Sequence, residues 1–261
     1  MKKSKVMLFG AMALTAGLAL AACGSSQSSN ADKTYSYIFV NNPDTLDYIT
    51  STRDSTSSIT TNLIDGLLEN DQYGNLIPSM AESWTVSKDG LTYTYKIRQG
   101  AKWYTSEGEE YADVTAHDFV TGLKYAADKK AENLYLVQDS IKGLADYVEG
   151  KSSDFGTVGV KAVDDYTLQY TLNQPETYWN SKTTASILSP VNEAFLKSKG
   201  DDFGSVTPSS ILSNGPYLFK SFTSKSLIEF DKNPNYWDKD NVKIEKVKLS
   251  FFDGSDQDSI T

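Results

Sequence analysis

Residues 77–103 read IPSMAESWTVSKDGLTYTYKIRQGAKW, and this stretch shows most directly how the chain folds. On both sides of Asp89-Gly90, apolar or aromatic residues alternate with polar ones. This alternation is typical of half-buried β-strands, because successive side chains point to opposite faces of a sheet. Asp-Gly is a favoured turn between two antiparallel strands. The stretch therefore predicts a β-hairpin whose alternating residues are Trp84, Val86, Leu91, Tyr93, Tyr95 and Ile97.

Further strands follow the same two-residue period on either side of this hairpin. Thr34 to Val40 alternates and predicts the first strand of the chain. Residues 158–172 predict a second hairpin, which turns at Asp164-Asp165, and residues 214–230 predict a third. The last predicted strand is defined by three alternating residues, Val247, Leu249 and Phe251.

Helical periodicity occurs in three places. One predicted helix runs through a Ser/Thr-rich start, and its apolar face is formed by Ile59, Leu63, Ile64, Leu67 and Leu68. Thr115 and Asp118 form a capping arrangement ahead of a second helix with Phe119, Leu123 and Ala126, although Asp replaces the usual Glu or Gln. A third helix is indicated by Val137, Ile141, Leu144 and Val148. Because strands and helices do not alternate regularly, we predict a mixed α/β class without a purely parallel, doubly wound sheet.

Composition limits the function classes that the chain can belong to. It has 261 residues, of which 39% are hydrophobic and 23% charged, and its net charge is −9. This balance is typical of a soluble globular protein and excludes a multispanning membrane protein. An acidic chain lacks the basic face by which proteins bind nucleic acids. A single cysteine also excludes an intrachain disulfide framework and a cysteine-cluster metal site.

The amino terminus has the layout of an export signal. Lys2, Lys3 and Lys5 precede an uncharged run over residues 6–22. The sequence Leu20-Ala21-Ala22-Cys23 resembles the bacterial lipobox, in which the cysteine is acylated and the preceding peptide is removed. We therefore expect residues 1–22 to be a lipoprotein signal peptide, Cys23 the lipid attachment site and residues 23–33 a flexible polar tether. The alternative is an ordinary secretory signal or a single-pass anchor with an incidental cysteine.

This maturation would also change the charge of the protein. Removing residues 1–22 takes away three lysines and no acidic residue, so the net charge moves from −9 to −12.

Motifs of catalysis are missing from the sequence. It contains no nucleophile elbow, no phosphate-binding loop and no dinucleotide fingerprint. His117 is the only histidine, and its place in the first turn of a predicted helix favours a solvated residue. The carboxylates at 107–110 and 253–258 leave a glycosidase-like pair open, and the second run lacks the glycine and glutamate of a calcium-binding EF-hand loop. We predict a non-enzymatic protein without a metal or cofactor.

Four motifs together resemble a known family. They are the stretch 77–103, Val114 to Phe119, Asn214-Gly215-Pro216-Tyr217 and Asn233-Pro234-Asn235-Tyr236-Trp237. Their order and spacing are similar to the oligopeptide-binding proteins of ABC importers, the bacterial extracellular solute-binding proteins of family 5, and most of all to the streptococcal lipoproteins of this kind. We interpret the motif side chains themselves as packing residues and turns, with their aromatic rings in the core.

The resemblance implies a periplasmic-binding-protein-like fold of type II, cluster C, which encloses an extended peptide between two lobes joined by a hinge. It assigns residues 34–66 and 191–253 to the first lobe, 67–190 to an extra subdomain and 254–261 to the crossover into a second lobe. Family members are much longer, so we expect a truncated first portion with open sheet edges, exposed apolar surface and impaired peptide binding.

The resemblance also implies a site and partners. The first lobe pairs with the peptide backbone through the loop after the first strand, which here holds Thr52, Arg53, Asp54 and Ser55, and Tyr135 falls near a position where an aromatic ring faces the ligand. The implied partners are oligopeptides and the permease subunits of an ABC transporter, at the outer face of a Gram-positive cell membrane. Two alternatives remain: a surface adhesin or sensor, and a binder of nickel, haem or oligosaccharides, of which the lone histidine disfavours the metal.

Overall fold

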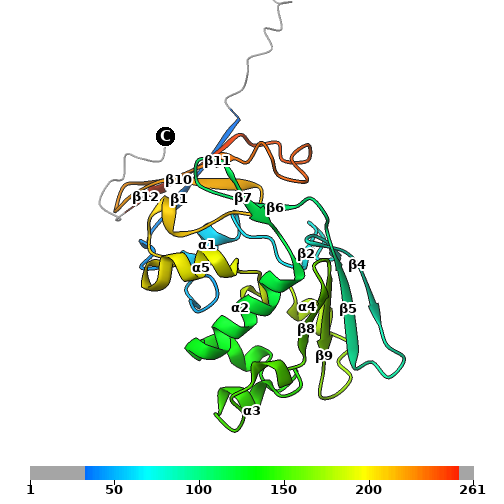
Figure 1. The fold of residues 1–261 in the computed structure, drawn as a ribbon. Coiled ribbons are helices and arrows are strands. Elements are labelled where there is room, and N and C mark those ends of the chain that lie inside the picture. The colour runs from blue at the N-terminus through cyan, green and yellow to red at the C-terminus, as the bar shows by residue number, and fades with distance from the viewer. Residues whose placement is uncertain (1–32, 253–261) are drawn as a thin grey trace, which may run out of the picture. The chain divides into compact units, whose positions relative to one another are not determined.

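Two four-stranded sheets organise residues 33–252, which are the part of the chain that the computed structural model describes (Figure 1). The predicted signal peptide, Cys23, the tether up to residue 32 and the acidic run at 253–258 lie outside these residues. Within residues 33–252, no helix has both the length and the apolar character needed to cross a membrane.

The first sheet, sheet A, joins the beginning and the end of the described chain. Its strand order is β1 (Thr34–Phe39), β12 (Lys246–Phe251), β11 (Leu227–Lys232) and β10 (Tyr217–Thr223). β1 runs parallel to β12, and the other pairs are antiparallel. The three predicted strand regions are thus confirmed, and a purely parallel sheet is absent from the described residues.

One face of sheet A is apolar and the other is charged. Ile228, Phe230 and Leu249 are buried, and the helices α1 (Asp54–Thr60) and α5 (Glu193–Lys199) lie on the same side of the sheet (Figure 1). On the opposite face, lysines of β12 pair with acids of β11, with Lys246 3.3 Å from Asp231 and Lys248 3.3 Å from Glu229. This alternation follows from the two-residue period of the strands.

The second sheet, sheet C, contains the hairpin that residues 77–103 predict. Its strand order is β4 (Ala81–Val86), β5 (Thr92–Ile97), β9 (Thr167–Thr171) and β8 (Val160–Asp164), all antiparallel. Gly90 closes the first turn by donating its N–H to the Ser87 carbonyl at 2.9 Å, with a φ of 71° that favours glycine. Tyr95 and Tyr170 are buried and meet edge to face, so the aromatic residues do pack a core.

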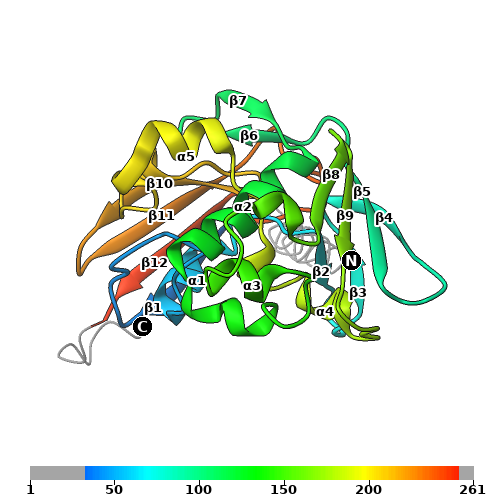
Figure 2. The same ribbon diagram turned by 60° about the horizontal axis from the view of Figure 1, so that its bottom comes forward.

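The long helix α2 (Ala116–Lys129) packs against β8 and β9 (Figure 2). Its start confirms the predicted cap, because Thr115 and Asp118 form a reciprocal capping box. The Asp118 carboxylate also accepts a hydrogen bond from Trp103 Nε1 at 3.1 Å. Burial raises the pKa of Asp118 to about 6, although the bond from the Thr115 backbone N–H opposes this shift.

The first predicted helix is shorter than its apolar spacing suggests. α1 ends at Thr60, and Leu68 instead begins β2 (Leu68–Asn70), which pairs with β3 (Leu76–Pro78). The reason is a set of long-range backbone bonds, because the Leu67 carbonyl accepts the N–H groups of Ser79 and Ala81. The predicted face is buried at Ile59, Leu63, Leu67 and Leu68, but only Ile59 belongs to the helix.

The third predicted helix is also wrong over most of its length. Only α3 (Leu144–Val148) is helical, because Gly143 adopts a φ of 72° and Ile141 forms a β-bridge with Leu172. Adding a side chain at Gly143 would place a Cβ 2.9 Å from the Thr157 carbonyl oxygen. The positive φ and this close approach explain why the chain breaks here.

The remaining elements are short. They are the hairpin β6 (Lys102–Tyr104) with β7 (Glu110–Asp113), the helix α4 (Trp179–Lys182) and the 3-10 helices η1 (Glu132–Leu136), η2 (Phe155–Thr157), η3 (Ser186–Leu188), η4 (Gly200–Asp202) and η5 (Pro208–Ser210). From residue 34 onward, the described chain forms one compact unit. The division into a first lobe and a subdomain at residues 66/67 and 190/191 stays a prediction.

Candidate functional site

Asp65, a buried carboxylate between α1 and β2, binds the Asn233–Trp237 motif through its side chain and the Asn214–Tyr217 motif through its backbone. Asp65 accepts hydrogen bonds from Tyr236 Oη at 2.7 Å and from Trp237 Nε1 at 3.2 Å, both at Oδ2. Burial raises the pKa of Asp65 to about 6, and the two donors oppose this rise. Asp65 therefore fixes the end of the Asn233–Trp237 turn.

The Asn214–Tyr217 motif holds the backbone at Asp65. The Asn214 side chain accepts the Asp65 N–H at 2.9 Å and donates to the Asp65 carbonyl at 3.2 Å. Position 215 needs glycine, because a Cβ there would lie 2.8 Å from the Leu63 carbonyl oxygen. The interpretation of these motifs as packing and turn residues is confirmed, and the joint they build is a rigid support for the neighbouring loops.

Arg98 fastens the hairpin of sheet C to the same joint. Its guanidinium lies 3.6 Å from the centre of the Trp237 ring and donates from Nη2 to the Ser79 carbonyl at 3.1 Å. The Arg98 side chain is mostly buried, and shielding from water strengthens both the stacking and the hydrogen bond.

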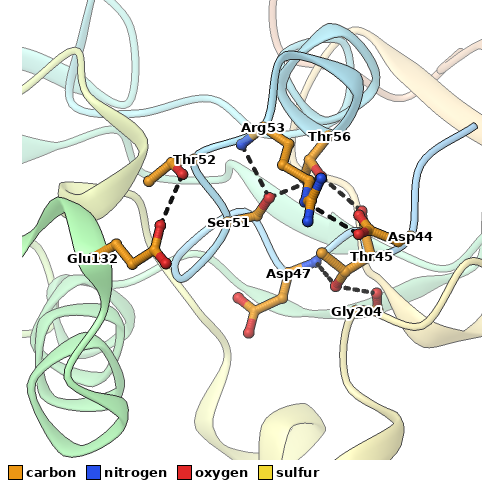
Figure 3. A network of polar contacts seen from close by, with 9 residues as sticks. All are labelled: Asp44, Thr45, Asp47, Ser51, Thr52, Arg53, Thr56, Glu132 and Gly204. Carbon is orange, nitrogen blue, oxygen red and sulfur yellow. Dashed lines mark hydrogen bonds and ion pairs between the residues drawn. The ribbon is translucent and has the colours of Figure 1, made fainter. Parts of the chain in front are cut away.

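Hydroxyl and carboxylate groups on the inner side of the loop between β1 and α1 hold it through hydrogen bonds (Figure 3). Ser51 Oγ donates to Thr56 Oγ1 at 2.9 Å, and Thr56 in turn donates to the Thr45 carbonyl at 2.8 Å. Asp47, which is buried, accepts the backbone N–H groups of Ile49 and Thr50. The loop therefore keeps one backbone conformation while its outer residues stay in solvent.

The predicted site residues occupy the outer side of this loop. Thr52, Arg53 and Asp54 are exposed and Ser55 is half-buried at the start of α1. Arg53 Nε lies 3.1 Å from Asp44 Oδ2 in an ion pair whose two side chains are more than half exposed. A polar hollow of about 470 Å³ opens beside this pair, lined by Asn41, Asn42, Asp44, Arg53, Asp54 and Ser55.

Tyr135, the other predicted contact, lies on η1, and one side-chain bond brings η1 to the loop. Thr52 Oγ1 donates to Glu132 Oε2 at 3.1 Å across 80 positions of sequence (Figure 3). The Tyr135 ring is 75% exposed, so most of its surface is open to solvent. The structure thus places Thr52 and the segment that carries Tyr135 side by side.

Two members of this surface were missed by sequence reasoning, Asp44 and Glu132. Asp44 stands next to the loop, and its position after Pro43 gave no signal of a pair with Arg53. Glu132 precedes Tyr135 by three positions, which in a 3-10 helix puts both side chains on one face. This spacing of three could have linked Glu132 to Tyr135, but only if the segment were known to be a 3-10 helix.

The remaining chemical candidates do not converge on a centre. His117 is exposed in the first turn of α2, as predicted, and its Nε2 lies 3.3 Å from Asp165. Between residues 33 and 252, no three His, Cys, Asp or Glu side chains gather closely enough to hold a metal ion. The loop surface with η1 therefore stays the candidate site among the described residues.

Comparison with known proteins shows what this chain is similar to. Residues 75–259 match the family described as bacterial extracellular solute-binding proteins, family 5 Middle. The chain is 65% identical over 258 residues to the oligopeptide-binding protein AliB of Streptococcus pneumoniae, in a match that covers 99% of this chain and 39% of AliB. It is 64% identical over 265 residues to the oligopeptide-binding protein SarA of Streptococcus gordonii, covering 98% of this chain and 40% of SarA.

A solved structure shares the fold. The structure of Listeria monocytogenes OppA bound to peptide superposes with a TM-score of 0.78 at 31% identity, covering 85% of this chain and 43% of that one. The present chain spans about two fifths of the length of the relatives it matches.

Proposed function

Since the chain belongs to the bacterial extracellular solute-binding proteins of family 5, we propose that it contributes one wall of a peptide-binding site in an ABC import system. Two of its relatives are named oligopeptide-binding proteins, and a related structure holds a peptide. The family consists of binding proteins, which supports a non-enzymatic role for this chain.

The observation that carries the proposal is the surface formed by the 52–55 loop and η1. Hydrogen bonds on the inner side of the loop hold its backbone, while Thr52 and Arg53 stay exposed. Thr52 is bonded to Glu132 of η1, and Tyr135 of the same short helix has a 75% exposed ring. A preorganised polar loop next to an aromatic ring suits a ligand that brings its own backbone N–H and C=O groups and variable side chains.

The physical logic of such a site is capture with little sequence selectivity. Every peptide presents the same backbone donors and acceptors, so a fixed loop can pair with many sequences. Side chains of different size can be accommodated through intervening water, as the polar hollow beside Arg53 allows. Closure between two walls would add affinity, and one wall alone supplies part of the contacts.

We expect short peptides to bind this chain weakly, with a dissociation constant of about 1 mM, because a single open wall buries little of the ligand. The measurement is a titration of the ¹⁵N-labelled chain with a mixed pool of short peptides, followed by amide chemical shifts. The shifts should concentrate at residues 52–55 and 132–136.

Tyr73 and Tyr178 provide matched controls, because both are exposed tyrosines away from the 52–55 loop in sequence. Replacing Tyr135 with alanine should reduce the peptide-induced shifts, whereas Tyr73→Ala should leave them unchanged. Submicromolar binding would contradict the weak affinity, and shifts confined to other surfaces would contradict the site.

We further propose that Cys23 anchors the protein to the outer face of the cell membrane through lipid. The support is the sequence Leu20-Ala21-Ala22-Cys23 behind an uncharged run, together with relatives that belong to an extracellular family. Metabolic labelling with a radioactive fatty acid should mark the wild-type protein and not a Cys23→Ser variant. Equal labelling of both would overturn the anchor.

The permease subunits of the ABC importer are the protein partners that we propose for this chain.

A further inference from the structure

A carboxylate and an exposed aromatic ring share one face of η1. In a 3-10 helix with three residues per turn, side chains at positions i and i+3 eclipse each other. Glu132 and Tyr135 have this spacing in η1, so the carboxylate and the ring lie on one face of the helix, and the carboxylate is bonded to Thr52 of the 52–55 loop.

The Glu132 carboxylate is held in place but its charge is not neutralised. Thr52 Oγ1 donates to Oε2, which restricts the side chain. Among residues 33–252, no lysine, arginine or histidine lies within ion-pair distance of Glu132: Arg53 pairs with Asp44, and Lys129 lies over the Tyr125 ring. A restrained carboxylate without a partner cation, beside an open ring, attracts a cation from outside.

We propose that Glu132, Thr52 and Tyr135 form a subsite for a lysine or arginine side chain of the bound peptide. The inference rests on the proposed peptide binding and adds a charge preference to it. The ammonium or guanidinium group would meet the carboxylate, and its methylene stem would lie along the Tyr135 ring. Thr52 acts as a positioning residue, because its hydroxyl sets the direction of the carboxylate.

The neighbouring charges favour the same sign of ligand. Around the loop, Asp44, Asp54 and Glu132 are acidic and Arg53 is the one basic residue among these four. Because Asp44 pairs with Arg53, these four residues keep a net charge of −2 from Asp54 and Glu132, while the exposed Lys129 and Lys130 precede η1 in sequence. The preference should therefore weaken as salt screens the exposed charges.

The test compares two peptides that differ in one side chain, Ala-Ala-Lys-Ala-Ala and Ala-Ala-Glu-Ala-Ala, titrated into the full chain and followed by amide shifts. We expect the lysine peptide to bind about five- to tenfold more tightly at about 50 mM salt, and the preference to shrink at about 500 mM. Glu132→Gln should reduce the preference to about twofold or less. Glu109→Gln is the matched control, because Glu109 is exposed and forms no ion pair among the described residues.

The aromatic contribution is tested at Tyr135. Tyr135→Phe should keep the preference for the lysine peptide, and Tyr135→Ala should weaken it, since the ring face and not the hydroxyl meets the cation. Equal affinity of the two peptides for the wild-type chain, or an unchanged preference in Glu132→Gln, would overturn the subsite while leaving peptide binding intact. If neither peptide shifts any resonance, the proposed function fails and the subsite fails with it.

Discussion

Replacing Asp65 with alanine will lower the free energy of unfolding by about 3 kcal/mol, because two donors lose their shared acceptor in a buried place. Tyr236 Oη and Trp237 Nε1 both donate to the same oxygen of Asp65, and Tyr236 is 7% exposed. Their desolvation in the native state would remain without compensation. Urea denaturation followed by tryptophan fluorescence measures the change, since Trp237 reports on the joint directly.

Asp65→Asn separates the hydrogen bonds from the charge. The asparagine oxygen can still accept both bonds, so we expect a loss of about 1 kcal/mol or less. The pKa of Asp65 is raised from 3.8 to about 6, so the folded state keeps its proton to a higher pH than the unfolded state does. The free energy of unfolding should therefore fall as pH rises from about 4 to about 6, and this slope should flatten in Asp65→Asn.

Other carboxylates set the background of that pH profile. The pKa of Asp118 is raised to about 6, and burial together with the nearby Asp65 and Asp238 raises the pKa of Glu69 to about 7, so both add to the loss of stability with rising pH. Hydrogen bonds lower the pKa values of Asp71 and Asp89, which act in the opposite direction at more acidic pH. A wild-type profile that rises between pH 4 and 6 would contradict the assignment.

The second large effect is expected from Gly122→Ala in α2. Alanine normally stabilises a helix relative to glycine by about 1 kcal/mol. Here a Cβ would lie 2.3 Å from the Ser189 carbonyl oxygen, in a segment that is itself held by the bond from the Val191 N–H to the Asp118 carbonyl. We expect the free energy of unfolding to fall by about 2–3 kcal/mol, because backbone has to move to admit one methyl group.

Thr121→Ala is the matched control for Gly122→Ala. Thr121 is the neighbouring residue of α2 and is half-buried, and its replacement should change stability by less than about 0.5 kcal/mol. If Gly122→Ala proves as stable as the wild type, the close approach of the Ser189 segment to α2 would be wrong.

The parts of the fold that sequence predicts well are those decided by near neighbours in the chain. The Ser87–Gly90 turn and the Thr115–Asp118 cap depend on residues three apart, and both are found where the pattern places them. The helix predicted over residues 59–68 fails because the Leu67 carbonyl is taken by Ser79 and Ala81 from another element. Apolar spacing gives the buried face correctly there, but it does not decide between a helix and a strand.

The candidate site shows the same limit. The polar loop at 52–55 and Tyr135 could be singled out from resemblance, yet their juxtaposition rests on one hydrogen bond between Thr52 and Glu132 across 80 positions. No periodicity in a single sequence encodes such a distant pair. The exposure of the Tyr135 ring was equally hidden, because an aromatic residue in a short apolar run, Leu134-Tyr135-Leu136, would ordinarily be assigned to the core.

The parallel pairing of β1 with β12 determines the order in which the two sheets can fold during synthesis. The strands of sheet C are all complete once residue 171 has left the ribosome, whereas β1 waits for residues 246–251 before it gains its neighbour. Until then the uncharged segment 34–40 has no partner strand and can pair with other chains. Folding should therefore be sequential, with sheet C early and a slow final step that depends on long-range contact at sheet A.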